Sequence, residues 1–333
     1  MIYRINSDGS GTQIRDYLKR KGYSYTAVKD LKKFMGQLRV NGLPVRADTV
    51  LYEGDILETD ENELKVSAVA PVEMPIDIVF EDEYLLAADK PPGLAVLPTR
   101  AHYNNSLANG VTAYMINKGA KDFIFRAVNR LDADTSGLIL IAKKKFVQHI
   151  VQKGLRKYYF LAVEGIIEKN GEIKLPIRDD KEKRMRAVGE GGAFAHTVYS
   201  PVRYGKNRDR DTGNIADMRR CPYACEKDAS DGQNRDITDT RYRYPRKNGV
   251  KGGRERDITG VLAETVTGRT HQLRVHFAAI GRPIIGDAKY GVRSDRIPRQ
   301  ALHSHIARFN HPVTGAETEI VCKIRDDIER LFD

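Results

Sequence analysis

The chain has 333 residues, a formal net charge of +11 and a pI of about 9.4. This length suits roughly two domains. A basic excess of this size favours a polyanionic partner, most often nucleic acid. No apolar run approaches the roughly 20 residues of a membrane span, and the first residues lack an apolar signal region. We therefore expect a cytoplasmic protein with no membrane partner.

The cysteine and histidine content excludes further kinds of site. Three cysteines are too few, and odd in number, for a disulfide framework, which favours a reducing compartment. Cys221 and Cys225 have no second pair at zinc-finger spacing, and His271 and His276 lack the spacing of a zinc-binding His-Glu-x-x-His helix. No phosphate-binding glycine-rich loop or dinucleotide fingerprint is present. We expect no metal and no cofactor.

Residues 1–66 are predicted to form a small α/β unit. Apolar residues recur at helical spacing in 13–21 and again in 27–34. Asn41 and Gly42 then separate two short apolar segments, which is a strong signal for a β-hairpin. The helices and the start of the hairpin are rich in basic residues. Those predicted to bind RNA are Lys19, Arg20, Lys29, Lys32, Lys33 and Arg39.

A run of charge is usually a solvated surface, but this unit is too small to hold an enzyme site, which favours binding. Two helices followed by the stretch from Arg39 to Gly42, and then by Glu53 to Asp55, resemble the RNA-binding domain named after ribosomal protein S-four. In that family the surface of the helices and hairpin clamps RNA. The resemblance covers about one sixth of the chain and implies an accessory RNA-binding domain.

Residues 67–75, with two prolines, are the predicted linker to a larger domain at 76–333. Its predicted strands and helices follow from apolar patterning. The strands are expected within 76–90 (two strands about an acidic turn), 138–142, 157–165, from 198 onward, and in 260–266, 301–309 and 317–321. The helices are expected at 107–118, 149–155 and 270–280.

Strands outnumber helices in this larger domain, and their connections are mixed. We therefore expect an α+β fold with flanking helices on a central sheet that is mixed but mostly antiparallel. Near 205–259 apolar residues become scarce, and arginine, lysine, aspartate, asparagine and glycine dominate. This stretch is predicted to be a polar insertion, either disordered or carrying additional RNA contacts.

Three segments of the larger domain carry residues suited to chemistry: 129–137, 157–165 and 267–276. Each also has a purely structural interpretation. Asp132 could cap its turn and pair with Arg130, and a tyrosine of the second segment could belong to the core. An arginine at the start of the third could bind phosphate at a helix N-terminus. The residues alone leave these alternatives open.

The same segments together resemble the RluA-type RNA pseudouridine synthase family. Its first signature, Arg-Leu-Asp followed by Thr-Ser-Gly, is matched from Asn129 to Gly137; many members have histidine at position 129. A Lys-x-Tyr strand that runs to Val-x-Gly is matched at 157–165. Gly-Arg-Thr-His-Gln-Leu-Arg-Val-His and the Gly-Asp-x-x-Tyr-Gly that follows are matched within 268–291. The resemblance covers about 76–325, and the family pattern lacks the insertion.

The resemblance implies a role for each matched residue. Asp132 would be the nucleophile, and Arg274 would pair with it and keep it ionised and oriented. Tyr159 would stack on the base or accept a proton from it. Arg130 would hold the flipped nucleotide. The remaining residues expected to bind substrate are Thr135, Arg269, His271 and Leu273.

The implied reaction isomerises uridine to pseudouridine in structured RNA. The target uridine must leave its helix at a cost of a few kcal/mol, which favours loops or bulges. Ribosomal RNA is the first expectation, transfer RNA the second, and the enzyme is expected to be a monomer. The alternative is a non-catalytic RNA-binding or RNA-folding protein on the same fold; a metal-dependent hydrolase built on the histidines is a third hypothesis.

Overall fold

The computed structural model describes residues 1–23, 28, 31, 38–59, 69–99, 103–120, 122–180, 182, 185–205, 257–291 and 293–333. Most of the predicted second helix, with Lys29, Lys32 and Lys33, therefore lies outside the described residues. Most of the predicted insertion and its two cysteines lie outside them as well.

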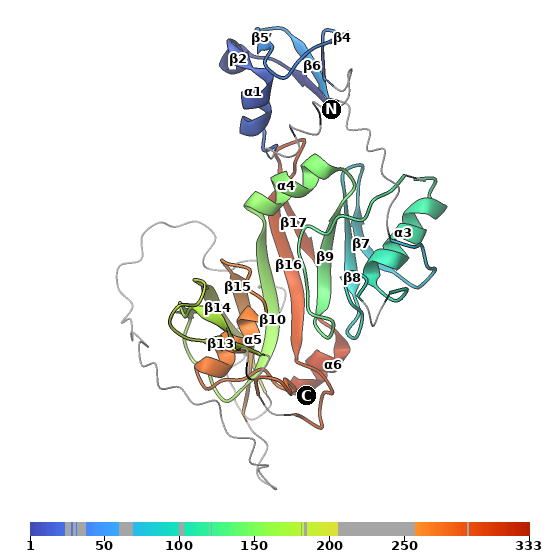
Figure 1. Cartoon of the computed structure of the whole chain (residues 1–333). Helices are drawn as coiled ribbons and strands as arrows, with labels where there is room; N and C mark the ends of the chain where they lie inside the picture. The colour runs from blue at the N-terminus through green and yellow to red at the C-terminus, as the bar shows by residue number, and fades with distance from the viewer. Residues whose placement is uncertain are drawn as a thin grey trace.

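Within the described residues, nine strands of the larger domain form one sheet (Figure 1). Eight strands follow one another across it, and β17 (Glu317–Val321) pairs with β16. In order across the sheet these eight are β11 (Gly171–Ile173), β14 (Thr197–Tyr204), β15 (Ile258–Thr265), β10 (Arg156–Glu164), β16 (Leu302–Asn310), β9 (Ser136–Ala142), β8 (Leu85–Lys90) and β7 (Asp77–Glu81).

Neighbouring strands of this sheet run antiparallel except for β9 and β16, which are parallel. Their contact is short: Ser136 and Gly137 pair with His303 and Ser304. The prediction of a mixed, mostly antiparallel sheet in an α+β fold is therefore confirmed. The parallel contact brings the start of β9 against the start of β16, two strands that are far apart in the sequence.

Alternation of side chains explains why β9 is buried along its whole length. Successive residues of a strand point to opposite faces of the sheet. Leu138 and Leu140 belong to the hydrophobic cluster that includes α4 (Lys145–Gly154), whereas Ile139 and Ile141 belong to the cluster that includes α3 (Leu107–Asn117). Both faces of the strand are thus covered, as expected for a continuous apolar run.

The other half of the sheet packs against α5 (Gln272–Ala279) and the C-terminal segment. Leu273 and Phe277 of α5 share one cluster with residues of β10. The same cluster includes Ile328 of α6 (Asp326–Glu329) and Phe332 of a following 3-10 turn (Arg330–Phe332). The C-terminal segment therefore contributes to the core that supports β10.

The N-terminal unit has its own small sheet and one described helix, α1 (Ile14–Arg20). Asn41 and Gly42 have positive φ in the predicted hairpin turn, as a two-residue turn of this type requires. The ring of Tyr23 stacks on Phe146 of α4 at 5.6 Å, and the unit lies beside α4 in Figure 1. Its strands are β1 (Ile2–Arg4), β2 (Thr12–Gln13), β3 (Leu38–Val40), β4 (Leu43–Pro44), β5 (Val50–Leu51) and β6 (Ile56–Thr59), with a 3-10 turn at Ser7–Gly9.

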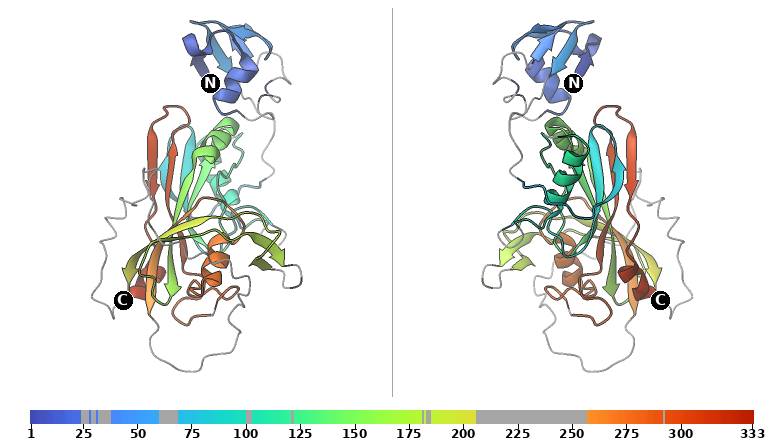
Figure 2. Two further views of the ribbon diagram at one scale, coloured as in Figure 1. Left: turned by 90° about the vertical axis from the view of Figure 1, so that its left-hand side faces the viewer. Right: turned by 90° about the vertical axis from the view of Figure 1, so that its right-hand side faces the viewer.

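The structure differs from the predicted elements in several places, and β1, β11 and α6 are among the elements that were not predicted. Helix α4 begins at Lys145, earlier than the predicted residue 149. A hairpin that was not predicted, β12 (Ile177–Asp180) with β13 (Met185–Val188), follows β11. Figure 2 shows this hairpin projecting from the sheet on the side where α5 lies. Its sequence is mostly charged, so it lacks the apolar alternation by which strands are recognised.

Candidate active site

Asp132 lies in the turn that leads into β9. The N–H of Thr135 donates to the carbonyl oxygen of Asp132 at 3.1 Å, and the strand already begins at Ser136. Gly137 has a φ of +106°, and a Cβ there would lie 2.2 Å from the carbonyl oxygen of Ser304. Only glycine fits this close approach, so the turn is held tightly against β16.

Three buried side chains hold this turn in place. Lys90 Nζ donates to the carbonyl oxygen of Ala133 at 2.6 Å, and also to those of Pro91 and Leu94. Arg299 Nη1 reaches the carbonyl oxygen of Asp134 at 3.4 Å, and Gln300 Nε2 donates to Thr135 Oγ1 at 3.2 Å. These contacts fix the backbone on the C-terminal side of Asp132.

Lys90 is fully buried, and burial lowers its pKa to about 7 against the opposing charge of Asp134. Its three carbonyl partners match the three hydrogens of an ammonium group. The side chain therefore serves to tie the turn to the end of β8.

Arg274 joins two carboxylates from different parts of the chain. Its Nη1 donates to Asp132 Oδ2 at 2.9 Å, while Nε and Nη2 donate to the two oxygens of Asp287 at 2.7 and 2.9 Å. The second pair is a bidentate fork, the strongest geometry available to a guanidinium. Asp287 is 1% exposed and also accepts from the N–H groups of Lys289 and Tyr290. The guanidinium that faces Asp132 is thereby held rigidly.

The contacts of Arg274 with Asp287 and Asp132 keep its guanidinium charged. Burial by itself would lower the pKa of Arg274, but its hydrogen bonds and ion pairs with Asp287 and Asp132 raise it above the ordinary value. Asp132 remains 28% exposed at the side chain. The arrangement thus presents a carboxylate to solvent with its cationic partner behind it.

His271 contacts the same carboxylate oxygen of Asp132 as Arg274 does. Its Nε2 is 3.6 Å from Asp132 Oδ2, and its Nδ1 is 2.7 Å from the Tyr290 hydroxyl. The residue has a left-handed backbone conformation, φ 58° and ψ 21°, immediately before α5. A non-glycine residue in this region is uncommon and is typical of functional sites. The strained backbone aims the imidazole at the carboxylate.

Tyr159 of β10 is buried beside this group, with an exposed fraction of 7%. Burial raises the pKa of its phenol above the ordinary value of 10, and the charge of Asp132 raises it further. The phenol is protonated near neutral pH.

Of the other residues predicted to bind substrate, two are exposed and two are buried. Arg130 is exposed. Arg269 is exposed too, and its Nε donates to the carbonyl oxygen of Phe194 at 2.9 Å. Thr135 is buried and accepts from Gln300, and Leu273 is buried in the core of α5. The two buried side chains support the site from inside, whereas the two arginines are accessible.

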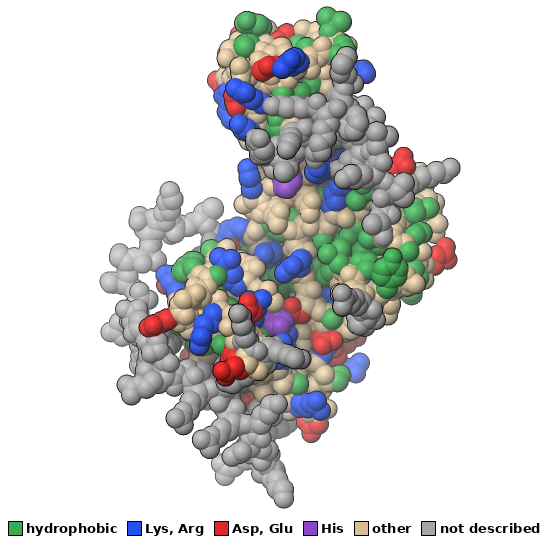
Figure 3. Space-filling model, viewed as in Figure 1, with side chains coloured by type: hydrophobic (Ala, Val, Ile, Leu, Met, Phe, Trp, Pro, Cys, Tyr) green, Lys and Arg blue, Asp and Glu red, His purple; other side chains and the backbone are tan. Residues whose placement is uncertain are grey.

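Of the residues predicted to bind RNA, Lys19, Arg20 and Arg39 are described, and all three are exposed. Lys19 pairs with Asp16 at 3.2 Å, and Arg20 Nη1 donates to the carbonyl oxygen of Asp8 at 3.3 Å. Basic side chains are visible on the N-terminal unit and again around β13 and α5 (Figure 3). Their role in RNA binding stays a prediction.

Several residues of the site were not predicted, among them Lys90, Asp287 and Tyr290. Asp287 and Tyr290 stand in the matched Gly-Asp-x-x-Tyr-Gly segment, so the motif contained them without indicating what they contact. Lys90 ends an apolar strand just before two prolines, a position that suggests a strand terminus and nothing more. A lysine fully buried in the fold is rare, but burial cannot be read from the sequence.

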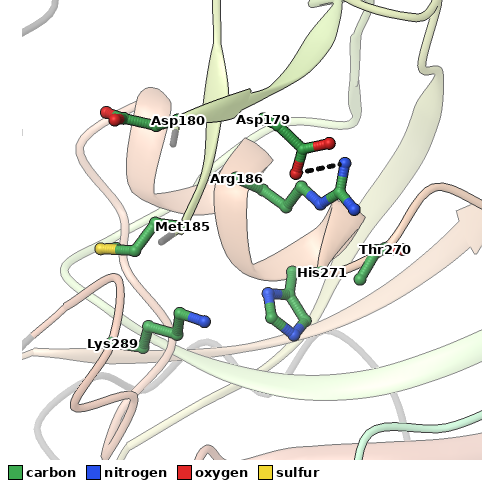
Figure 4. A pocket seen from close by; sticks show the side chains of 7 residues that line it. All are labelled: Asp179, Asp180, Met185, Arg186, Thr270, His271 and Lys289. Atoms are coloured by element: carbon green, nitrogen blue, oxygen red, sulfur yellow. Dashed lines mark ion pairs between the residues drawn. The ribbon is translucent and has the colours of Figure 1, made fainter. Parts of the chain in front are cut away.

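A cavity of about 410 Å³ adjoins the group on the side of the β12–β13 hairpin (Figure 4). It is lined by Asp179, Asp180, Met185, Arg186, Thr270, His271 and Lys289. In the part of the chain that the structure describes, no cluster of three or more His, Cys, Asp or Glu side chains is placed to hold a metal ion. The described helices likewise include none that is long and apolar enough to cross a membrane.

A family model described as RNA pseudouridylate synthase matches residues 84–279, which include Asp132, Tyr159 and Arg274. The chain belongs to the RNA pseudouridylate synthase family. It is therefore an RNA pseudouridine synthase, an enzyme that isomerises uridine to pseudouridine in RNA. The resemblance to the RluA-type enzymes of this family is confirmed at this level, while the roles of individual residues stay predictions.

Relatives of this pseudouridine synthase extend over nearly the whole chain. The uncharacterized RNA pseudouridine synthase YjbO of Bacillus subtilis is 32% identical over 96% of this chain and 98% of its own. Ribosomal large subunit pseudouridine synthase D of Pseudomonas aeruginosa is 26% identical over 88% of this chain and 82% of its own.

Among solved structures, human RNA pseudouridylate synthase domain containing 1 has a similar fold, with a TM-score of 0.52 and 20% identity. The alignment covers 78% of this chain and 88% of the human one. The predicted domain boundaries, the S-four-like character of the N-terminal unit and the cytoplasmic location stay predictions.

Proposed function

We propose that Asp132 is the nucleophile with which this synthase isomerises a specific uridine in structured RNA, and that the RNA is ribosomal. The observation that carries the residue assignment is the ion pair of Asp132 with Arg274, whose guanidinium is fixed in turn by the fork with Asp287. An ionised, oriented and partly exposed carboxylate is what a nucleophile of this kind requires.

The net reaction needs no oxidant or co-reactant. The bond from the anomeric carbon of the ribose to the ring nitrogen breaks, a bond from the same carbon to the fifth ring carbon forms, and a proton leaves that carbon while the freed nitrogen gains one. Asp132 attacks the anomeric carbon or the sixth ring carbon, or drives elimination to a glycal. In each route its ion pair with Arg274 holds the carboxylate in a fixed orientation.

The neighbouring side chains have distinct tasks in this proposal. Tyr159 packs against the uracil ring in this proposal. The alternative role of proton acceptor is disfavoured in the free enzyme, because the raised pKa of Tyr159 keeps its phenol protonated. Arg130 and Arg269 are exposed and contact the RNA backbone around the flipped nucleotide. Thr135 and Leu273 are buried, and we assign them to the support of the site.

Ribosomal RNA is the proposed substrate because relatives over most of the chain, such as the enzyme of Pseudomonas aeruginosa, are named for the ribosomal large subunit. The exposed basic residues of the N-terminal unit supply a second contact with a large, structured RNA. A bulge or loop of such an RNA offers an unpaired uridine at low energetic cost.

The experiment is to map pseudouridines in total RNA from cells that lack the gene. At least one ribosomal RNA position should lose its pseudouridine, wild-type enzyme should restore it, and Asp132→Ala should not. If the lost pseudouridine lies in transfer RNA, the substrate assignment is wrong. If Asp132→Ala restores modification, the nucleophile assignment is wrong.

A further inference from the structure

The cavity beside the hairpin shares one wall with the reacting carboxylate. His271 lines the cavity, and the same ring places Nε2 3.6 Å from Asp132 Oδ2. Figure 4 shows its imidazole near Lys289 and below the hairpin residue Arg186, which come from separate segments. A molecule bound in this cavity would therefore contact the hairpin and the residue next to Asp132 together.

A chain of hydrogen bonds also connects the hairpin to Asp132. The backbone N–H of Arg186 donates to the Tyr290 hydroxyl oxygen at 3.1 Å, and that hydroxyl lies 2.7 Å from His271 Nδ1. Tyr290 itself is buried and held by Asp287, which accepts from its backbone N–H. The hairpin and the Arg274–Asp287 pair are thus both linked to this one tyrosine.

The contact with Tyr290 bears on the state of His271. The Tyr290 hydroxyl accepts from the N–H of Arg186, and its own hydrogen is available to His271 Nδ1. When the hydroxyl donates to Nδ1, the ring hydrogen is on Nε2, the nitrogen nearer Asp132. Burial lowers the pKa of His271 against the opposing charge of Asp132, so the ring is neutral near pH 7. A neutral imidazole in this tautomer has its N–H on the nitrogen that lies 3.6 Å from Asp132 Oδ2.

The lining of the cavity suits a nucleotide. A volume of about 410 Å³ lies in the range of small-ligand sites. Arg186 is paired with Asp179 at 2.8 Å, whereas exposed Lys289 has no ion pair within the described residues. Lys289 is therefore available for a phosphate, and Met185 offers an apolar surface to a base.

The position of the cavity selects which nucleotide it holds. If the target uridine is at Asp132, the neighbouring nucleotide of the same strand must lie one step away, and His271 separates Asp132 from this cavity. We propose that the cavity binds the nucleotide next to the target uridine, and that Tyr290 couples its occupancy to Asp132 through His271. This inference rests on the proposed uridine isomerisation at Asp132.

The coupling has a simple physical basis. A base that packs against Met185 fixes β13, and β13 carries the N–H group that donates to Tyr290. With β13 fixed, the tyrosine hydroxyl holds His271 in the tautomer and orientation that direct Nε2–H at Asp132. RNA bound with the neighbouring nucleotide in place thereby orders the group that flanks the nucleophile. The hairpin contacts the neighbouring nucleotide, and Tyr290 is a positioning residue that acts through His271.

The first test is Tyr290→Phe, assayed on unmodified RNA that carries the mapped uridine. We expect kcat to fall about 10-fold with KM within about twofold, because the ring and its packing remain while the relay is lost. The matched control is Tyr204→Phe, which removes a tyrosine hydrogen bond to the carbonyl oxygen of Ile167 far from Asp132. It should leave kcat unchanged. Equal kcat effects in the two variants would overturn the relay.

The second test addresses the phosphate. Lys289→Gln should raise KM for RNA about fivefold and leave kcat unchanged, because one phosphate contact is lost. Lys323→Gln, at a lysine whose side chain is 81% exposed in the C-terminal segment, is the control and should have no effect. Identical KM values for the two variants would remove the phosphate contact from the proposal.

The deciding test uses RNAs with an abasic residue on one side or the other of the target uridine. One of the two should bind wild-type enzyme about fivefold more weakly and react more slowly, and Tyr290→Phe should abolish the effect on rate but not on affinity. Unchanged affinity and rate for both abasic RNAs would refute the subsite. That outcome differs from absence of pseudouridine in the intact RNA, which would instead refute the proposed function.

Discussion

Around Asp132 the charged side chains are buried and bonded to one another, whereas in the N-terminal unit they are exposed. The side chain of Arg274 is 10% exposed and contacts two carboxylates. One of these, Asp287, is 1% exposed. Lys19 is 49% exposed and pairs with Asp16 on the same helix. Buried pairs hold their geometry, and exposed pairs contribute little to stability.

This difference separates two tasks of the enzyme. A reacting carboxylate must be placed within fractions of an ångström, which a rigid network of buried partners provides. Attraction of RNA needs only accessible positive charge, and its strength depends on the salt concentration. Changes in the buried network should therefore alter kcat and stability, and changes in the N-terminal unit should alter affinity.

The largest effect is expected from Arg274→Met. It leaves Asp287 buried without its cation, which costs about 3–5 kcal/mol of stability, and it frees Asp132 to move. We expect at least a ~10³-fold loss of kcat by single-turnover kinetics at a temperature where the variant is folded, with RNA affinity retained.

The matched control for this variant is Arg308→Met. Arg308 is similarly buried and pairs with Glu319, but it lies four residues beyond the contact of β16 with β9, about 13 Å along the strand. It should lower stability and leave kcat intact. An equal loss of kcat in both would mean that general destabilisation explains the effect.

An intermediate effect is expected from the double variant Lys19→Gln with Arg39→Gln. Removing two exposed charges should weaken RNA binding about 3- to 10-fold at moderate salt and reduce the slope of log Kd against log salt by about 1–2. The value of kcat at saturating RNA should not change. Salt titrations of binding measure this, and an unchanged slope would show that the unit does not contact phosphates.

The smallest effect tests a charge cluster away from the site. Burial alone would raise the pKa of Glu81, but hydrogen bonds from Lys118, Lys143 and Tyr114 lower it from 4.5 to about 2. The native state therefore gains stability, roughly 1–2 kcal/mol after a reduction for solvent screening, that is complete above about pH 4.5 and is lost as the pH falls toward 2.

Urea unfolding of Glu81→Gln at several pH values checks this gain. The variant should be less stable at neutral pH and should lose less stability on acidification than the wild type. Glu317→Gln, at an exposed glutamate, should match the wild type at every pH. An unchanged pH dependence in Glu81→Gln would contradict the assignment.

The sequence was sufficient for features that depend on short segments and matched motifs. The apolar run after Ser136 predicted a buried strand, and the asparagine–glycine pair predicted the N-terminal hairpin turn. The family resemblance placed Arg274 opposite Asp132, and the structure shows these two side chains 2.9 Å apart. Family motifs of this kind include residues that contact each other in the fold, even where many residues separate them in the sequence.

The features that were missed depend on contacts between distant segments. The parallel pairing of β9 with β16 is a meeting of residues 136 and 303, for which no local pattern exists. Lys90 and Asp287 are polar residues whose importance comes from being buried. In the hairpin at 177–188, Ile177, Met185 and Val188 pack in the hydrophobic cluster that includes Val275 of α5, but a run of charged residues separates Ile177 from the other two, so hydrophobic alternation could not predict the hairpin.

RNA labelled with tritium on the fifth carbon of uracil shows whether Asp132 performs the isomerisation and is not needed for binding. Wild-type enzyme should release tritium at the target uridine, and Asp132→Ala should bind the same RNA with a Kd within about twofold and release none. Retention of all tritium by wild-type reactions, or release by Asp132→Ala, would contradict the account.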